Sequence, residues 1–273
     1  GDDYIHGGSD GSLNDTGSWE FSVPDGSMPL LDQGWTINLR ANSATFSAGI
    51  ALASETDAVF EIEHVIGSGY DDTITGNDAS NRLEGDLGND TLIDDSSGPD
   101  TLIGGQGTDT AIFTGFFSSG TVFDMVQGHR SYNGTVIDEF SQIENLVFDG
   151  NVTVIGDGED NHLSASLPDA ARDSSISGGS GDDTIDAGAG NDTVLGGNGD
   201  DLIIDRLEIG SNSTLSGNGN TDTLDLSGAG TGFTYVAGGP LSGNNGVELD
   251  VSGFEHIIGS AFADRIEELP GLD

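Results

Sequence analysis

Residues 178–201 read GGSGDDTIDAGAGNDTVLGGNGDD, and this stretch decides the fold. An aspartate recurs every nine positions, at Asp183, Asp192 and Asp201, and an aliphatic residue follows each aspartate two positions later. The aliphatic residue and its neighbours form a short strand whose central side chain points inward. The glycine-rich remainder has the composition of a turn, in which glycine permits positive φ. The sequence therefore predicts a strand and turn of nine residues that repeats along the chain.

The same pattern recurs in two blocks. The first block reads GSGYDDTIT, GNDASNRLE, GDLGNDTLI, SGPDTLI and GGQGTDTAI from Gly67 onward. The second reads GDGEDNHLS from Gly156 and, between loops, GGSGDDTID, AGAGNDTVL, GGNGDDLII and GNGNTDTLD; an isolated copy, GSAFADRIE, begins at Gly259. An acidic, disordered linker would have no reason to keep an aliphatic residue two places after each aspartate. The regularity favours a folded solenoid.

Aspartates 18 positions apart lie on the same edge of such a solenoid if two nonapeptides complete one coil. Asp72 and Asp90 have this separation, as do Asp183 and Asp201. Each stacked pair, together with the carbonyl oxygens of nearby glycines, offers the six or so hard oxygens that calcium takes in proteins. Magnesium is smaller and dehydrates reluctantly, so it suits a carbonyl-rich site less well. The spacing predicts calcium sites.

The composition supports a cationic ligand. The 273 residues carry 48 acidic side chains against six basic ones, a formal net charge of −42, and 45 glycines. Self-repulsion and glycine entropy oppose folding unless a cation binds, and the charge disfavours nucleic acid and anionic membranes as partners. The chain has no cysteine, which excludes disulfides and thiolate metal sites. No apolar run reaches the ~20 residues of a membrane span.

These nonapeptides resemble the RTX (repeats-in-toxin, hemolysin-type) repeat, and the resemblance covers residues 67–112 and 156–225 well. It implies an all-β fold: blocks of parallel β-roll, a type of β-helix or solenoid, with intervening antiparallel β segments. It also implies that several Ca²⁺ ions bind at the turns. The residues expected at the calcium sites are Asp72, Asn81, Gly85, Gly88, Asp90, Asp100, Gly105, Gly107, Asp109, Gly179, Gly181, Asp183, Gly188, Gly190, Asp192, Gly197, Gly199, Asp201, Asp222 and Asp264.

The repeat pattern divides the chain into six segments. We expect the end of an upstream repeat block at 1–12, a strand-rich segment at 13–66, a first calcium roll at 67–112, a connecting β segment at 113–155, a second calcium roll at 156–225, and a strand-rich segment with the start of a further repeat at 226–273. Residues 113–155 should lack repeat-type calcium. Sites should be weaker at Asn81, Ser174 and Ser213, and Asp32, Asp57 and Asp138 lie off the repeat register.

Segments outside the perfect repeats resemble one another. EHVIGS begins at Glu63, EHIIGS at Glu255, and IENLVF at Ile143. Tyr70 and Phe262 follow the first two where the repeat has glycine, so we interpret these segments as capping turns that cover the ends of a roll.

No residue pattern indicates an active site. His64 and His256 occupy equivalent places in the duplicated segment, where Asn145 stands in the third copy, so these positions are interpreted as structural. GGSDG at 7–11 matches a nucleophile-elbow pattern that glycine- and serine-rich sequence produces by chance. We therefore expect no enzymatic activity.

The leading hypothesis is a calcium-dependent folding module of a larger secreted bacterial protein, of which this chain is a fragment. RTX-like proteins typically leave the cell unfolded through type I secretion machinery and fold in extracellular calcium. One alternative is an extracellular adhesin or polysaccharide-binding module, although the repeats show no regular row of outward threonines or aromatics. Another is an accessory domain of a secreted enzyme.

Overall fold

The computed structural model describes residues 4–6, 16–18, 34–46, 56–60, 63–94, 98–115, 117–165, 172–207 and 211–267. Within these ranges every regular element is a strand, which confirms the expected all-β class. None of the described residues belongs to a helix that could cross a membrane. The chain divides into two compact units: residues 1–115, 128–130 and 135–145 form unit 1, and residues 116–127, 131–134 and 146–273 form unit 2.

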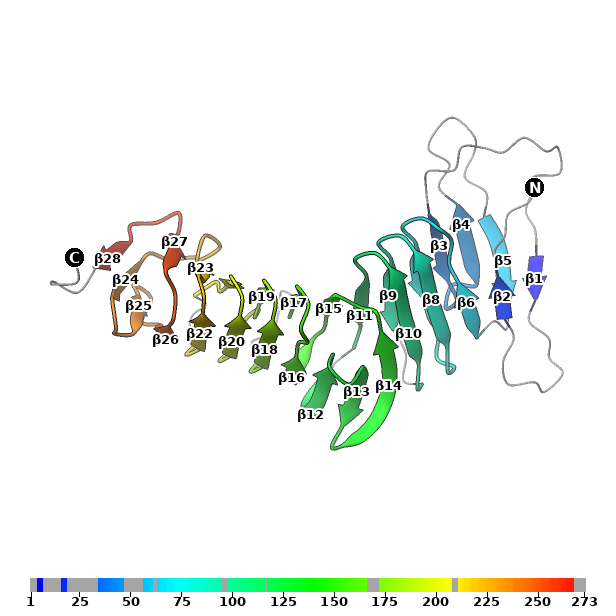
Figure 1. Cartoon of the computed structure of the whole chain (residues 1–273), viewed down its shortest axis with the longest axis horizontal. Helices are drawn as coiled ribbons and strands as arrows, with labels where there is room; N and C mark the ends of the chain where they lie inside the picture. Colours follow the sequence, from blue (N-terminus) through cyan, green and yellow to red (C-terminus); the bar gives the residue numbers. More distant parts are fainter. Residues whose placement is uncertain are drawn as a thin grey trace, which may run out of the picture. The chain divides into compact units, whose positions relative to one another are not determined.

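Unit 1 is built from two sheets whose strands follow one another in Figure 1. One sheet has the order β1-β5-β4-β3-β7-β9-β11 and the other has the order β2-β6-β8-β10-β14. Its strands are β1 (Tyr4–His6), β2 (Thr16–Ser18), β3 (Trp35–Asn38), β4 (Ser43–Phe46), β5 (Thr56–Phe60), β6 (His64–Ile66), β7 (Thr73–Thr75), β8 (Arg82–Leu87), β9 (Thr91–Asp94), β10 (Thr101–Gln106), β11 (Thr110–Phe113) and β14 (Thr135–Ser141). The pairs from β3 through β11 and from β6 through β14 are parallel, whereas β3–β4 and β4–β5 are antiparallel.

Unit 2 repeats the arrangement with the orders β17-β19-β21-β23-β27 and β12-β16-β18-β20-β22-β26-β25-β24-β28. Its strands are β12 (Phe117–Asp124), β16 (Gly150–Ile155), β17 (His162–Ser164), β18 (Ser175–Ser180), β19 (Thr184–Asp186), β20 (Thr193–Asn198), β21 (Leu202–Ile204), β22 (Thr214–Gly219), β23 (Thr223–Asp225), β24 (Phe233–Val236), β25 (Leu241–Gly243), β26 (Glu248–Ser252), β27 (His256–Ile258) and β28 (Arg265–Glu267). Two further strands, β13 (His129–Tyr132) and β15 (Asn145–Val147), contain residues of both units. In unit 2, β24–β25 and β25–β26 are antiparallel and the repeat strands are parallel.

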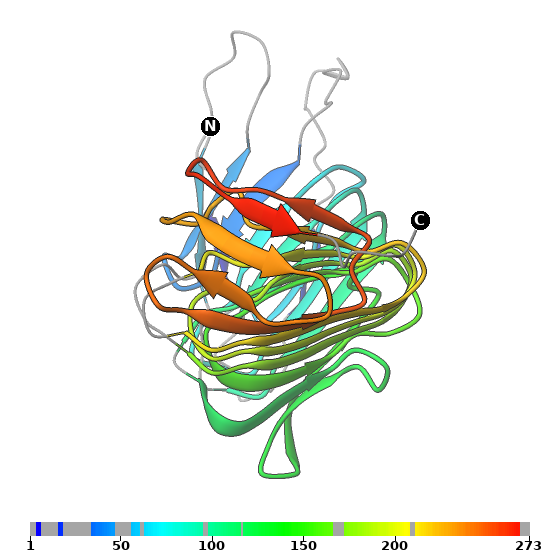
Figure 2. The ribbon, with the colours of Figure 1, turned by 90° about the vertical axis from the view of Figure 1, so that its left-hand side faces the viewer.

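Successive repeat strands alternate between the two sheets, so two nonapeptides complete one coil, as expected. In unit 1, β7 pairs with β9 and not with β8, and Ile74 lies opposite Leu92. In unit 2, Ile185 lies opposite Ile203, and Ile203 opposite Leu224. All five side chains are fully buried. The aliphatic residue of each nonapeptide therefore forms a column through the core, and Figure 2 shows the coils of unit 2 superimposed along this direction.

Threonines form a row on the outer face of unit 1. Thr36, Thr73, Thr91 and Thr110 are aligned in register on β3, β7, β9 and β11. The expectation that the repeats show no regular row of outward threonines is therefore wrong. Each threonine directly precedes a buried residue and so points to the opposite face, and parallel pairing aligns these residues across coils.

The segments interpreted as capping turns are strands of the roll. His64–Ile66 is β6, which lies between β2 and β8, and His256–Ile258 is β27, which pairs in parallel with β23. Val65 is fully buried opposite Leu83, as an ordinary repeat residue would be. These segments follow the repeat with glutamate at the aspartate position, and the altered spacing before them hid the match.

Aromatic side chains pack within each unit. The ring centroids of Phe113 and Phe140 are 5.9 Å apart in unit 1. In unit 2, the ring of Phe123 lies 5.5 Å from that of Phe117 and 5.8 Å from that of Phe148. The division into six segments expected from the sequence stays a prediction.

Candidate metal centre

A line of carboxylates connects the coils of unit 1 at one edge of the roll. The backbone N–H of Asp72 donates to Oδ1 of Asp90 at 2.7 Å, and the N–H of Asp90 donates to Oδ1 of Asp109 at 2.7 Å. The N–H of Asp109 donates to Oε2 of Glu144, also at 2.7 Å. We call such a line an aspartate ladder, because each rung joins one coil to the next.

Unit 2 carries a second aspartate ladder of the same kind. The N–H of Asn161 donates to Asp183, that of Asp183 to Asp201, and that of Asp201 to Asp222, each at 2.9 Å. The N–H of Asp222 then donates to Oε2 of Glu255 at 2.9 Å. The 18-residue spacing of Asp183 and Asp201 therefore places them in adjacent coils, as the sequence predicts.

The opposite edges carry shorter ladders. In unit 1 the N–H of Asn81 donates to Asp100 at 2.7 Å, and that of Asp100 donates to Asp138 at 3.0 Å. In unit 2 the N–H of Ser174 donates to Asp192 at 2.8 Å, and that of Asp192 donates to Oγ of Ser213 at 3.1 Å. Serine supplies no carboxylate, so this edge of unit 2 is poorer in negative oxygens.

Six ladder aspartates combine deep burial with an unused oxygen. Each is at most 2 % exposed, and within the described part of the chain its Oδ2 atom has no hydrogen-bond donor. The six are Asp90, Asp109, Asp183, Asp192, Asp201 and Asp222. Leaving a buried polar atom unpaired costs ~1–3 kcal/mol, and more if it is charged. Six such atoms, one to a coil edge, therefore indicate a missing positive partner.

Glycines shape the space beside these oxygens. A Cβ atom at Gly85 would collide with Oδ2 of Asp90 and lie 2.6 Å from the carbonyl oxygen of Gly104 in the next coil. A Cβ at Gly178 would likewise collide with Asp183 and lie 2.6 Å from the carbonyl oxygen of Gly196. Carboxylate and carbonyl oxygens of successive coils thus meet in cradles that a side chain would fill.

Nine of the predicted site glycines have positive φ, which L-residues adopt at a cost. For Gly197, φ is 131°, and a Cβ would also overlap the carbonyl oxygen of Gly179 in the preceding coil. The nine are Gly88, Gly105, Gly107, Gly179, Gly181, Gly188, Gly190, Gly197 and Gly199.

Burial shifts the titration of the ladder carboxylates. Desolvation raises the pKa of Asp90, Asp183 and Asp192 to about 7 in each case, and nearby carboxylates add to the effect. Burial also raises the pKa of Asp72, Asp109, Asp201 and Asp222. A nearby positive charge would offset the lost hydration and favour the ionised form of each carboxylate.

The donor set fits calcium. Each cradle brings an unpaired carboxylate oxygen beside backbone carbonyl oxygens of glycines, so a bound ion would draw on carbonyls as well as carboxylates. Calcium accepts six to eight oxygens, carbonyls included, in flexible geometry, whereas magnesium demands a near-ideal octahedron. The orphaned Oδ2 atoms beside the glycine carbonyls meet this requirement.

Three predicted metal positions differ from the six. Asp72 and Asp264 accept hydrogen bonds from the backbone and hydroxyl of Ser68 and Ser260, respectively, and Asn81 accepts one from the N–H of Asn77. Asp100 is 3 % exposed and occupies a ladder position. The assignment of individual residues as calcium ligands stays a prediction.

Asp138 was expected off the repeat register, and that expectation is wrong. Glu139 pairs with Thr101 on β10, so Asp138 takes the same ladder place as Asp100. It is fully buried, and Oδ2 accepts a hydrogen bond from Nε of Arg130, whose Nη2 lies 3.6 Å from Oδ2 of Asp94. Residues 114–134 intervene before the chain returns to this edge, so the spacing between successive ladder residues there increases from 19 to 38 positions.

Sequence reasoning also missed Glu144, Glu255 and Asn161 as ladder members. Each precedes a hydrophobic residue by two positions, as the repeat aspartates do: Leu146 follows Glu144, and Leu163 follows Asn161. This acidic-or-amide-x-hydrophobic pattern is the signal that would have found them.

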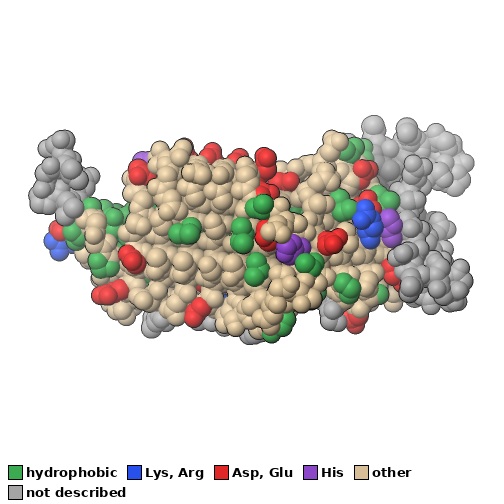
Figure 3. Space-filling view, turned by 60° about the horizontal axis from the view of Figure 1, so that its bottom comes forward, with side chains coloured by type: hydrophobic (Ala, Val, Ile, Leu, Met, Phe, Trp, Pro, Cys, Tyr) green, Lys and Arg blue, Asp and Glu red, His purple; other side chains and the backbone are tan. Residues whose placement is uncertain are grey.

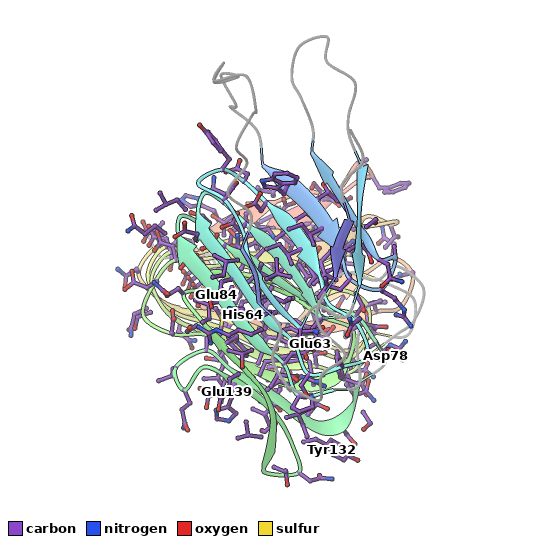
Figure 4. All side chains as sticks on the ribbon, turned by 90° about the vertical axis from the view of Figure 1, so that its right-hand side faces the viewer. Glu63, His64, Asp78, Glu84, Tyr132 and Glu139 are labelled. Carbon is purple, nitrogen blue, oxygen red and sulfur yellow. The ribbon has the colours of Figure 1, made fainter. Side chains whose placement is uncertain are left out.

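His64 lies on the outer face of unit 1, beside Glu84 in Figure 4. Its Nε2 is 2.7 Å from Oε1 of Glu84, and Nε of Arg82 donates to the same oxygen at 2.6 Å. Glu84, on the next coil, thus contacts both the ring of His64 and the guanidinium of Arg82.

Acidic side chains are dispersed over the face shown in Figure 3, which is largely backbone and small polar residues. The acidic residues behind the formal charge of −42 therefore form no single patch on this face. Some of them, the ladder aspartates, are buried in the interior. Parallel coils whose turns repeatedly place a buried aspartate beside a glycine cradle define a calcium-binding β-roll.

Comparison with known families agrees with this class. The family model described as RTX calcium-binding nonapeptide repeat (4 copies) matches residues 61–92, 93–112 and 171–203. The matched segments are RTX calcium-binding repeats, which supports a calcium-binding structural module built from them. No curated protein matches the chain.

Proposed function

We propose that this chain is a calcium-dependent folding module of a larger secreted bacterial protein, unfolded without calcium and folded outside the cell. The six buried, unpartnered Oδ2 atoms carry the proposal. In the calcium-free folded state these carboxylates lose hydration without gaining a counter-charge, which opposes folding. Calcium that binds only the folded state stabilises it by RT ln(1 + [Ca²⁺]/Kd) for each site.

Secretion through type I machinery follows the same thermodynamics. Cytosolic calcium is scarce, so the chain stays unfolded and can thread a channel. Extracellular calcium then folds it. The proposed role is structural, and we propose no enzymatic activity for the described residues.

Circular dichroism tests the proposal directly. Far-ultraviolet spectra should change from disordered to β-sheet on titration of a chelated sample with calcium, and equal concentrations of magnesium should act weakly. A β-sheet spectrum that persists in excess chelator would contradict the proposal.

A second candidate function is binding of an extracellular polysaccharide, favoured by the outward row of Thr36, Thr73, Thr91 and Thr110. Aligned hydroxyls at the ~4.8 Å spacing of strands could hydrogen-bond a linear glycan, and calcium could bridge acidic sugars. Glycan-array binding by the calcium-loaded chain, lost in Thr91→Val, would support this function. The same threonine row could also serve only to stabilise the sheet, and a glycan array that shows no binding would favour this structural role.

A further inference from the structure

Ten turns in the described part of the chain fall into two kinds, which differ at the position four residues before the residue that stands at the repeat aspartate position. In the first kind, the backbone N–H at that position donates to the ladder side chain of the same turn. Asn77 donates to Asn81 at 2.7 Å, Asp157 to Asn161 at 3.1 Å, and Ser260 to Asp264 at 2.8 Å. Ser68 donates to Asp72 in the same way. We call these four closed turns.

Side chains reinforce the closed turns. The hydroxyl of Ser68 donates to Oδ1 of Asp72 at 3.2 Å, and that of Ser260 donates to Oδ1 of Asp264 at 2.7 Å. The amide of Asn81 donates back to Oδ1 of Asn77 at 3.3 Å, and the amide of Asn161 does the same to Asp157 at 3.2 Å. In every closed turn, both polar atoms of the ladder side chain are engaged by the protein itself.

In the second kind, the residue at that position has positive φ. The φ values are 83° at Asp86, 125° at Gly105, 113° at Gly179, 79° at Gly188, 131° at Gly197 and 76° at Asn218. Four residues later stand Asp90, Asp109, Asp183, Asp192, Asp201 and Asp222, the six aspartates whose Oδ2 lacks a donor among the described residues. We call these open turns. Aspartate and asparagine adopt positive φ more readily than other non-glycine residues, and Asp86 and Asn218 show that the turn keeps this conformation without glycine.

We infer that the closed turns form without calcium and that only the open turns bind it. The inference rests on the proposed calcium-dependent function and states which turns serve it. In a closed turn, an N–H group directs its positive end at the oxygen that a cation would need. In an open turn no donor takes this place, and the carboxylate oxygen is left beside a carbonyl-lined cradle.

The two long ladders share the order of their turns. In the long ladder of unit 1 the first side chain is that of Asp72, in a closed turn, and it also accepts the backbone N–H of Trp35. The ladder continues through Asp90 and Asp109 and ends at Glu144. That of unit 2 begins at the closed turn of Asn161 and ends at Glu255. Each long ladder thus has its first side chain on a turn that the protein closes by itself, which offers a preformed edge to the first calcium-binding coil.

Counting bound calcium in matched variants tests the inference. Asp90→Asn and Asp72→Asn each remove one negative charge. The two side chains are equally buried and lie in adjacent coils. Equilibrium dialysis at saturating calcium should show that Asp90→Asn binds at least one ion fewer than the unmodified chain, whereas Asp72→Asn binds the same number. An equal loss from Asp72→Asn would overturn the inference.

Asn161→Asp provides the converse test. Its outcome does not depend on whether the chain still folds after the Asp72 carboxylate is removed. It adds a carboxylate to a closed turn, and we expect no additional ion; one additional ion would contradict us. An unmodified chain that binds no calcium, or that is folded in chelator, would overturn the proposed function itself. Calcium-dependent folding with ions lost equally from both turn types would overturn only the present inference.

Discussion

Arg130 and Asp138 form an ion pair inside unit 1, at a ladder place where other coils leave an aspartate oxygen without a donor. The guanidinium also lies 5.7 Å from the ring centroid of Phe113. The chain thus supplies its own cation here, held between a carboxylate and an aromatic face.

Replacing this cation should be costly even in calcium. Arg130→Met leaves Asp138 and Asp94 buried beside an apolar side chain, and loss of one partner of a buried pair costs ~3–5 kcal/mol. Urea unfolding at saturating calcium measures the change. Arg265→Met is the control, because its pair with Glu267 is exposed and such pairs contribute ~0–1 kcal/mol. Arg130→Met/Asp138→Asn should recover part of the loss, and equal costs for both single variants would contradict the interpretation.

Asp201 and Asp250 should differ sharply in their effect on calcium-dependent folding. Asp201 is buried with an unpartnered oxygen, whereas Asp250 is exposed. Asp201→Ala should raise the calcium concentration at the folding midpoint several-fold, and Asp250→Ala should leave it nearly unchanged. Midpoints shifted equally would show that net charge, and not ladder position, controls folding.

Acid should partly replace calcium. Burial raises the pKa of Asp90, Asp183 and Asp192 to about 7 in the folded chain, above the unfolded value of ~3.9. A raised folded pKa means that protonation favours the fold, so this contribution is lost as pH rises through about 7. In chelator, β-sheet content should therefore be greater at pH 5 than at pH 8. Calcium affinity should show the reverse trend because ions and protons compete. A pH-independent spectrum in chelator would rule this out.

The glycine conformations can be tested with a single methyl group. Gly197→Ala places a Cβ at a φ of 131° and against the backbone of Gly179, so the variant should need more calcium to fold. Gly230→Ala is the matched control, because no described atom lies within 4 Å of a Cβ there. Equal calcium titrations of the two variants would show that the cradle tolerates side chains.

The core column gives a prediction independent of calcium chemistry. Ile203 is fully buried, and Ile203→Ala should lower the free energy of unfolding by ~2–5 kcal/mol. Leu195 is 42 % exposed on the outer face, and Leu195→Ala should cost well under half as much. Urea unfolding in saturating calcium compares the two.

The nine-residue period predicts the strand, the inward aliphatic residue and the two-strand coil, because each depends only on local alternation and on 18-residue spacing. It fails where the chain leaves the roll and returns. Asp138 and Glu144 stand at the two edges of the roll after a segment that interrupts the repeat, and the length of that segment is not a multiple of the nine-residue period. The threonine row was missed for a related reason, since alignment across coils is a property of stacked strands. The closed turns depend on one backbone angle at Ser68 or Asn77, which residue type alone does not determine.

The pairing of Thr184 with Leu202 shows that one coil begins again after 18 residues, with Asp183 and Asp201 directly before it. Removal of residues 184–201 would join Asp183 to Leu202 and recreate the junction that Asp201 already makes. The ladder would lose one rung. Asn161 at its start and Glu255 at its end would each still lie next to an aspartate of the adjacent coil. Duplication or loss of the corresponding gene segment can therefore lengthen or shorten the roll by whole coils, while the residues at both ends stay the same.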